Sequence, residues 1–212
     1  MPPPRAVLFD WDGTLLDSAG ATFRGYQRLF AEYGVPFDRG SFERTYCPDW
    51  YRTYEAVGLP RVHWSEADQR WLAFYAEDPP ALLPGARAAL ARLTAARVPL
   101  GLVTSGQRER VVRDLERLEL GAVFASVVCG TDVPERKPHP APLRRALAEM
   151  NVSAADAAYV GDSPEDVTMA RAADVTSVAV PGGYPNRTEL IAAQPDLFAE
   201  SLEEALTALD LR

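Results

Sequence analysis

Residues 6–17 have the sequence Ala-Val-Leu-Phe-Asp-Trp-Asp-Gly-Thr-Leu-Leu-Asp, in which a short apolar run stops at the carboxylate of Asp10. A continuous apolar run of this length, closed by a polar turn, is typical of a strand buried inside a parallel sheet. Asp10 then marks the carboxyl end of that strand, and open α/β sheets bind their ligands beyond this end. The segment therefore predicts both the first strand of the fold and the position of a site.

The rest of the chain continues with short apolar segments that alternate with helical segments rich in Ala, Leu and Arg. Such alternation predicts an α/β fold with a Rossmann-like parallel sheet. We expect the later strands at residues 100–104, 126–129, 157–161 and 176–180. The helices that pack on them are expected at residues 84–96, 107–118, 139–150, 164–173 and 202–209.

A different composition marks the segment that follows the first strand. Fourteen of the twenty aromatic residues lie between Phe23 and Tyr75. This segment lacks a strand pattern and has amphipathic spacing, which predicts helices at residues 20–34, 40–57 and 64–77. We therefore expect two domains, a Rossmann-like core of residues 1–17 and 84–212 and an inserted helical domain of residues 18–83.

The overall composition excludes several classes of protein. The 212 residues carry a formal net charge of −8, which repels phosphate backbones, so we expect no binding to nucleic acid. Cys47 and Cys129 stand far apart without a Cys/His cluster, which argues against a disulfide framework and a zinc site. No apolar stretch has membrane-spanning length and no signal-peptide pattern occurs, which predicts a cytoplasmic protein without membrane association. The sequence gives no indication of the oligomeric state.

Side chains that can bind cations and anions follow four of the expected strands. Because the carboxyl ends of parallel strands meet at one edge of the sheet, we expect these side chains to lie close together. They comprise four carboxylates, two hydroxyls, one glycine and one ammonium: Asp10, Asp12, Thr104, Ser105, Gly106, Lys137, Asp162 and Asp166.

This set of side chains predicts a site for phosphoryl transfer. Neighbouring carboxylates need a counter-charge, and oxygen ligands without His or Cys are those that Mg²⁺ prefers. The donors at Thr104, Ser105 and Gly106 precede an expected helix, which is a suitable place for an anion. A metal, an anion site and nucleophilic carboxylates together are typical of phosphoryl transfer.

Lys137 is the only Lys in a chain whose other twenty-one cationic side chains are Arg. A compact ammonium and a planar guanidinium are not interchangeable at a crowded site. The single Lys falls at the cationic position that a phosphoryl-transfer site requires, so we expect Lys137 to be functional.

On four motifs the chain resembles the haloacid dehalogenase-like superfamily of phosphohydrolases. The motifs, in chain order, are residues 10–17, Thr104, residues 137–138 and residues 161–166. The inserted segment resembles the helical cap domain of the phosphoglycolate phosphatase and β-phosphoglucomutase branch. One departure is the segment Ala172-Ala173-Asp174, where relatives often have Ala-Gly; it lies at a helix end and affects no catalytic role.

The resemblance implies a role for each residue of the site. Asp10 would be the nucleophile that forms an aspartyl-phosphate, and Asp12 would be the general acid and base. Thr104 and Lys137 would complete the catalytic set. The Mg²⁺ site would be formed by Asp10, Asp12 through its backbone carbonyl, Asp162 and Asp166. The phosphate of a small phosphate ester would be bound by Thr104, Ser105, Gly106 and Lys137.

Several activities of this superfamily can be weighed from the sequence. Asp12 argues against a dehalogenase, since the metal-independent members lack this second carboxylate. Phosphonate-cleaving relatives form a Schiff base with a cap Lys, and residues 18–83 contain none. We expect Mg²⁺-dependent hydrolysis of a small phosphorylated metabolite, either phosphoglycolate-like or a sugar phosphate. A phosphomutase, a nucleotidase or pyrophosphatase of the same superfamily, and a non-catalytic binding protein are the alternatives.

Overall fold

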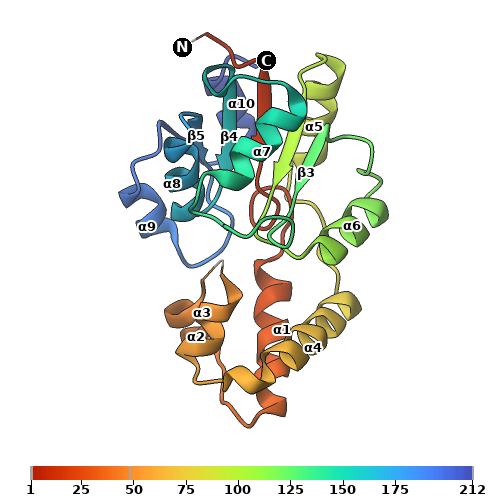
Figure 1. Cartoon of the computed structure of the whole chain (residues 1–212), viewed down its shortest axis with the longest axis vertical. Coiled ribbons are helices and arrows are strands. Elements are labelled where there is room, and N and C mark those ends of the chain that lie inside the picture. The colour runs from red at the N-terminus through yellow and green to blue at the C-terminus, as the bar shows by residue number, and fades with distance from the viewer. Residues whose placement is uncertain (1, 48, 212) are drawn as a thin grey trace. The chain divides into compact units, whose positions relative to one another are not determined.

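The computed structural model describes residues 2–47 and 49–211 of the chain (Figure 1). The chain forms two compact units, one made of Met1–Asp17 and Ala81–Arg212 and the other of Ser18–Pro80. The first unit contains the sheet, and the second consists of helices. Within the described ranges, none of the helices is both long enough and apolar enough to cross a lipid bilayer.

A parallel sheet of six strands, in the order β3-β2-β1-β4-β5-β6, forms the centre of the first unit. In the middle of this sheet Phe9 pairs with Leu102 on one side and with Val160 on the other. The Rossmann-like parallel sheet expected from the sequence is confirmed. The strands are β1 (Ala6–Phe9), β2 (Leu100–Val103), β3 (Ser126–Val128), β4 (Ala157–Gly161), β5 (Thr176–Ala179) and β6 (Leu197–Phe198).

Helices cover both faces of this sheet (Figure 1). Val7 and Phe9 of β1 belong to the core that includes α5, α6 and α10, whereas Leu8 belongs to the core that includes α7 and α8. Because β1 is buried on both faces, its sequence is apolar without alternation. The helices of this unit are α5 (Ala86–Ala95), α6 (Arg108–Arg117), α7 (Ala141–Met150), η2 (Ala154–Asp156), α8 (Pro164–Ala172), α9 (Arg187–Ala192) and α10 (Leu202–Ala208).

Three short elements of the first unit, β6, α9 and η2, were not predicted from the sequence. The edge strand β6 has only two residues, and its position is defined by the pairing of Leu197 with Val178 of β5. Helix α9 has six residues. Elements of this length are too short to produce a periodic pattern, so only their contacts with the sheet reveal them.

The second unit contains α1 (Ala19–Glu32), α2 (Arg39–Thr45), α3 (Trp50–Ala56), η1 (Arg61–His63) and α4 (Trp64–Glu77). The prediction of one helix over residues 40–57 is wrong, because α2 and α3 are separate helices. Asp49 begins the second of them by accepting a hydrogen bond of 3.3 Å from the backbone N–H of Tyr51. A residue that precedes proline disfavours the helical conformation, so Cys47 is a natural place for the break. Pro48 itself lies outside the described residues.

The aromatic residues of the second unit pack mainly on one another, and three of them also bond to a half-buried carboxylate. The carboxylate of Asp68 accepts hydrogen bonds from Trp50 Nε1 (3.0 Å), the Tyr51 hydroxyl (2.9 Å) and the Tyr54 hydroxyl (3.2 Å). Tyr54 in turn meets the ring of Tyr26 edge-on, with the ring centroids 6.4 Å apart. This packing accounts for the concentration of aromatic residues between Phe23 and Tyr75, since they build the interior of this unit.

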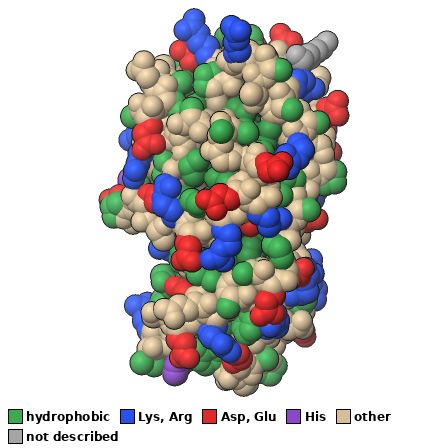
Figure 2. Space-filling model, turned by 90° about the vertical axis from the view of Figure 1, so that its right-hand side faces the viewer, with side chains coloured by type: hydrophobic (Ala, Val, Ile, Leu, Met, Phe, Trp, Pro, Cys, Tyr) green, Lys and Arg blue, Asp and Glu red, His purple; other side chains and the backbone are tan. Residues whose placement is uncertain are grey.

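Positive and negative side chains are interspersed over the face shown in Figure 2. Exposed ion pairs such as Arg187 with Glu200, whose charged atoms lie 2.6 Å apart, are frequent in the structure. Such pairs contribute at most about 1 kcal/mol each, because water and salt screen them. The exposed ion pairs therefore contribute little to the stability of the fold.

Candidate active site

Three buried carboxylates meet at the carboxyl edge of the sheet. Asp10 follows β1 and Asp162 follows β4, and the strand order changes direction between these neighbouring strands. Such a switch point leaves a crevice beyond the strand ends. Asp166 lies in the first turn of α8, and oxygens of Asp10, Asp162 and Asp166 lie within 4.8 Å of one another. The structure therefore brings together the three residues whose carboxyl side chains were expected to bind the metal, whereas Asp12 was expected to bind it through its backbone carbonyl.

Lys137 joins this cluster from the loop between β3 and α7. Its ammonium nitrogen lies 2.6 Å from Oδ1 of Asp10 and 2.7 Å from Oδ1 of Asp166. The same nitrogen lies 5.3 Å from the ring centroid of Tyr159, a cation–π contact. The only lysine side chain is thus buried between two carboxylates, where its charge is needed.

The three carboxylates and the one ammonium of this cluster do not balance in charge, and the pKa values of the cluster reflect this. Burial raises the pKa of Asp10 to about 7, although the charge of Lys137 opposes the shift. Burial, followed by the charge of Asp10, raises the pKa of Asp162 well above its usual range. Burial alone would lower the pKa of Lys137, but the charges of Asp10 and Asp166 outweigh it, so this pKa is raised. One ammonium does not compensate three carboxylates, and a bound cation would supply the missing charge.

Asp166 holds the cluster together through a dense set of hydrogen bonds. Its Oδ2 accepts from the backbone N–H of Asp162 (3.2 Å), the N–H of Ser163 (3.0 Å) and the Ser163 hydroxyl (2.7 Å). Ser163 and Asp166 form the capping box of α8. The Tyr159 hydroxyl lies 3.1 Å from Oδ1, which also accepts from Lys137. Both oxygens of Asp166 are engaged, so this residue is well suited to orient the Lys137 ammonium.

Asp162 has the opposite environment. Its Oδ2 is buried and has no hydrogen-bond partner among the described residues. A side chain at Gly13, which has a φ of +82°, or at Gly182 would overlap this oxygen. The two glycines therefore keep space beside an unsatisfied carboxylate oxygen. An ionised carboxylate buried in this way is costly unless a cation binds to it, so the residues present fit a metal site.

The predicted anion loop follows β2, the strand beside β1. Thr104 is buried, and its hydroxyl accepts a hydrogen bond of 3.0 Å from the backbone N–H of Gly106. Ser105 is half-buried. A side chain at Gly130 would overlap the backbone carbonyl of Ser105, so the loop packs directly on the segment that follows β3. Thr104, Ser105 and Gly106 thus lie at the sheet edge that carries Asp10.

The side chain of Asp12 points to a partner that sequence reasoning missed. Arg110, in α6, donates from Nη1 to Oδ1 of Asp12 at 3.0 Å and from Nη2 to Oδ2. Its Nη1 also lies 3.4 Å from Oδ2 of Asp114. The Arg110 side chain is only 7% exposed. In the sequence, Arg110 and Asp114 are four positions apart and stand next to the apolar residues Val111 and Leu115. This spacing indicates a buried ion pair within the helix, but it gives no sign that Asp12 also binds to the arginine.

Trp11 lies between Asp10 and Asp12 in the chain but belongs to the hydrophobic core. Its side chain is fully buried with Leu15 and Leu16. This packing stabilises the turn after β1.

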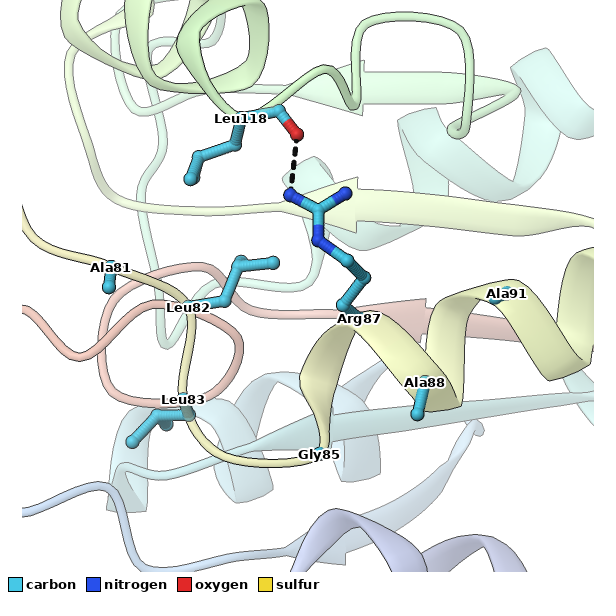
Figure 3. A pocket seen from close by; sticks show the side chains of 8 residues that line it. All are labelled: Ala81, Leu82, Leu83, Gly85, Arg87, Ala88, Ala91 and Leu118. Atoms are coloured by element: carbon cyan, nitrogen blue, oxygen red, sulfur yellow. Dashed lines mark hydrogen bonds between the residues drawn. The ribbon is translucent and has the colours of Figure 1, made fainter.

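A surface hollow elsewhere on the first unit has the wrong chemistry for the reaction (Figure 3). It has a volume of about 670 Å³ and is lined by residues 81–83, one side of α5 and Leu118. Most of its lining consists of Ala and Leu, and the guanidinium of Arg87 donates a hydrogen bond of 2.8 Å to the carbonyl of Leu118. None of the eight predicted site residues lines it.

One family model matches most of the chain. The model of the haloacid dehalogenase-like hydrolases matches residues 7–180. The chain belongs to this family. The match begins in β1 and ends after β5, and so includes all the motifs quoted above.

Known relatives of this hydrolase cover most of its length. The phosphoglycolate phosphatase of Escherichia coli (strain K12) is 35% identical over 98% of this chain and 93% of its own. That of Rhodospirillum rubrum is 37% identical over 85% of this chain and 81% of its own. Among solved structures, CbbY from Rhodobacter sphaeroides in complex with phosphate has a TM-score of 0.81 and 27% identity, covering 98% and 99% of the two chains. The expected family is confirmed, and so is a phosphatase that acts on a small phosphorylated substrate.

Proposed function

We propose that this phosphatase hydrolyses 2-phosphoglycolate, or a closely similar small carboxylated phosphate monoester, with the help of Mg²⁺. The observation that carries the proposal is the buried Lys137 ammonium between Asp10 and Asp166, beside the unsatisfied oxygen of Asp162. This arrangement provides a nucleophile, its counter-charge and a place for a cation within one cluster. The phosphoglycolate phosphatases of similar sequence support the choice of substrate.

The reaction divides into two displacements at phosphorus. In the first, an oxygen of Asp10 forms a bond to phosphorus while the bond from phosphorus to the ester oxygen breaks, and Asp12 donates a proton to the departing alkoxide. In the second, Asp12 takes a proton from water, the water oxygen bonds to phosphorus, and the bond to Asp10 breaks. Lys137 stabilises the charge on Asp10 and on the phosphoryl oxygens in both steps.

The carboxylates of Asp10 and Asp162, with the backbone carbonyl of Asp12, would hold the Mg²⁺. All are oxygen ligands, as a hard cation requires. Bound there, Mg²⁺ would neutralise the charge that collects on the phosphoryl oxygens. Asp166, whose oxygens already accept hydrogen bonds from Ser163, Asp162 and Lys137, would mainly orient the site.

The remaining predicted residues have supporting roles in this proposal. Thr104 and Ser105 would donate hydrogen bonds to the phosphoryl group, and the Gly106 N–H, which donates to the Thr104 hydroxyl at 3.0 Å, would orient that hydroxyl. The helical unit Ser18–Pro80 would act as the cap that excludes water during turnover. A cytoplasmic location is supported by the buried free thiol of Cys129, since secreted proteins commonly pair their cysteines.

Phosphate release by the purified protein tests the proposal. The assay would compare 2-phosphoglycolate with glucose 1-phosphate, a nucleoside monophosphate and pyrophosphate, each with Mg²⁺ and with a chelator. We expect the highest kcat/KM for 2-phosphoglycolate, with no turnover in the chelator. Asp10→Asn, purified in parallel, should be inactive. Isomerisation of glucose 1-phosphate without phosphate release would indicate a mutase, and an active Asp10→Asn variant would refute the assigned nucleophile.

A further inference from the structure

The pair of Arg110 and Asp12 conflicts with the role proposed for Asp12. The guanidinium engages both carboxylate oxygens of Asp12. Proton transfer to an ester oxygen requires one of these oxygens to be within hydrogen-bond reach of that atom. Asp12 must therefore leave Arg110, at least in part, before it can act, and a buried guanidinium then loses a bidentate partner.

We propose that Arg110 is the receptor for the carboxylate of the substrate, and that Asp12 occupies this receptor until the substrate arrives. This inference rests on the proposed function and extends it to a specificity-determining residue. Substrate binding would exchange one carboxylate for another on the same guanidinium, so Arg110 keeps a bidentate partner and Asp12 is released to the ester oxygen.

The chemistry of the substrate matches this exchange. In 2-phosphoglycolate the carboxylate carbon lies two bonds from the ester oxygen. Arg110 lies within hydrogen-bond distance of Asp12, the residue proposed to reach that same ester oxygen. A group that pairs with Asp12 at rest is therefore within a few ångströms of where this carboxylate would lie. A phosphate ester without a nearby anionic group could not take the place of Asp12.

The position of Arg110 beside the anion loop supports the same assignment. A side chain at Gly106 would overlap a terminal nitrogen of Arg110, and it would approach the Thr104 hydroxyl to 3.3 Å. The guanidinium therefore lies against the loop proposed to bind the phosphoryl group, in space that the absence of a side chain at Gly106 provides. The phosphate and carboxylate of one small molecule could be bound at the same time.

Asp114 explains how the exchange can occur in a buried site. It is 3% exposed, and its Oδ2 lies 3.4 Å from Nη1 of Arg110, the nitrogen that also donates to Asp12. Burial raises its pKa, which the charge of Arg110 opposes. Asp114 would stay beside Arg110 during the exchange of the other carboxylate, so the guanidinium is never left as an isolated buried charge.

The test is the ratio of kcat/KM for 2-phosphoglycolate to kcat/KM for ethyl phosphate, in which a methyl group replaces the carboxylate. We expect Arg110→Gln to lower this ratio about 30- to 100-fold, the loss typical of a charge-assisted bidentate contact. Arg110→Lys, which keeps the charge but not the planar fork, should give an intermediate ratio. Arg113→Gln is the matched control, because Arg113 lies on the same helix, is exposed and pairs with Glu109.

Because both substrates are assayed on one preparation, a loss of folded protein cancels in the ratio. A wild-type preference for 2-phosphoglycolate that persists in Arg110→Gln would overturn the inference and leave the proposed function intact. An equal fall for both substrates would also overturn it, since that is the result of a purely structural role. A wild-type enzyme that is active on other esters but shows no such preference would refute the proposed substrate.

Discussion

The ammonium of Lys137 lies 2.6 Å from the carboxylate of Asp10, although 127 positions separate the two residues in the chain. Both side chains are buried, with 4% and 8% of their surface exposed. The pair connects the central strand β1 to the loop after β3. Removing one partner of a buried ion pair leaves an uncompensated charge and typically lowers the free energy of unfolding by about 3–5 kcal/mol. A substitution at either residue should therefore affect stability as well as activity.

Lys137→Arg should abolish most of the activity even though the formal charge is unchanged. The ammonium makes contacts of 2.6 and 2.7 Å with two buried carboxylates, and a planar guanidinium is too large to reproduce both. We expect kcat for p-nitrophenyl phosphate to fall about 10²- to 10³-fold, as for the loss of other charge-stabilising groups. Arg144→Lys, an exchange on the exposed side of α7, is the matched control. Turnover near the wild-type rate would show that Lys137 does not act as a localised charge.

The stability of the metal-free protein should fall as the pH rises through neutrality. Burial raises the pKa of Asp10 to about 7 in the folded state, from an unfolded value of 3.8. The stabilisation by the protonated carboxyl is complete below the unfolded pKa and is lost as pH rises through 7. We expect the free energy of unfolding to decrease by about 2–3 kcal/mol between pH 5 and 8, because each pKa unit corresponds to about 1.4 kcal/mol.

Urea unfolding in a chelating buffer measures this dependence on pH. Asp10→Asn should make the curve flatter, since the amide does not ionise. Added Mg²⁺ should stabilise the protein more at pH 8 than at pH 5, because the cation binds the ionised carboxylates. A metal-free protein that becomes steadily more stable from pH 5 to 8 would contradict the burial of an uncompensated carboxyl.

Asp162→Asn should have opposite effects on stability and on metal binding: the metal-free protein should become more stable, while Mg²⁺ binding should be lost. The unpartnered, buried Oδ2 and the raised pKa both indicate that the ionised carboxylate destabilises the metal-free protein. We expect the variant to have a higher free energy of unfolding than the wild type in chelator at pH 8, because the amide has no charge to be buried. Its activity should fall sharply, and Mg²⁺ should no longer raise the melting temperature. A variant that is less stable in chelator and still responds to Mg²⁺ would mean that Asp162 has a structural role.

The site residues that could be predicted from the sequence are those with a recognisable local sequence pattern. Asp10 ends a continuous apolar run, Asp166 stands at a helix start, and Lys137 is the one Lys. Arg110 has no comparable signal, because a cation in an amphipathic helix usually faces solvent and its partner Asp12 lies 98 positions away. Pairings of this range depend on the register of the sheet and the packing of helices, which local propensity does not determine.

Gly13→Ala should weaken Mg²⁺ binding because the added methyl group overlaps Asp162, and this effect can be distinguished from backbone strain. Gly13 has a φ of +82°, and an added Cβ would overlap Oδ2 of Asp162 and approach the Tyr184 ring to 2.8 Å. Gly85 has a φ of +81° with open space around it, so Gly85→Ala introduces the same strain without the overlap.

Both variants should lose about 1–2 kcal/mol of stability from the left-handed conformation. Only Gly13→Ala should need more Mg²⁺ for half-maximal activity, by about tenfold if the displaced carboxylate costs 1.4 kcal/mol of binding. Equal Mg²⁺ requirements in the two variants would show that the space beside Asp162 does not hold the cation.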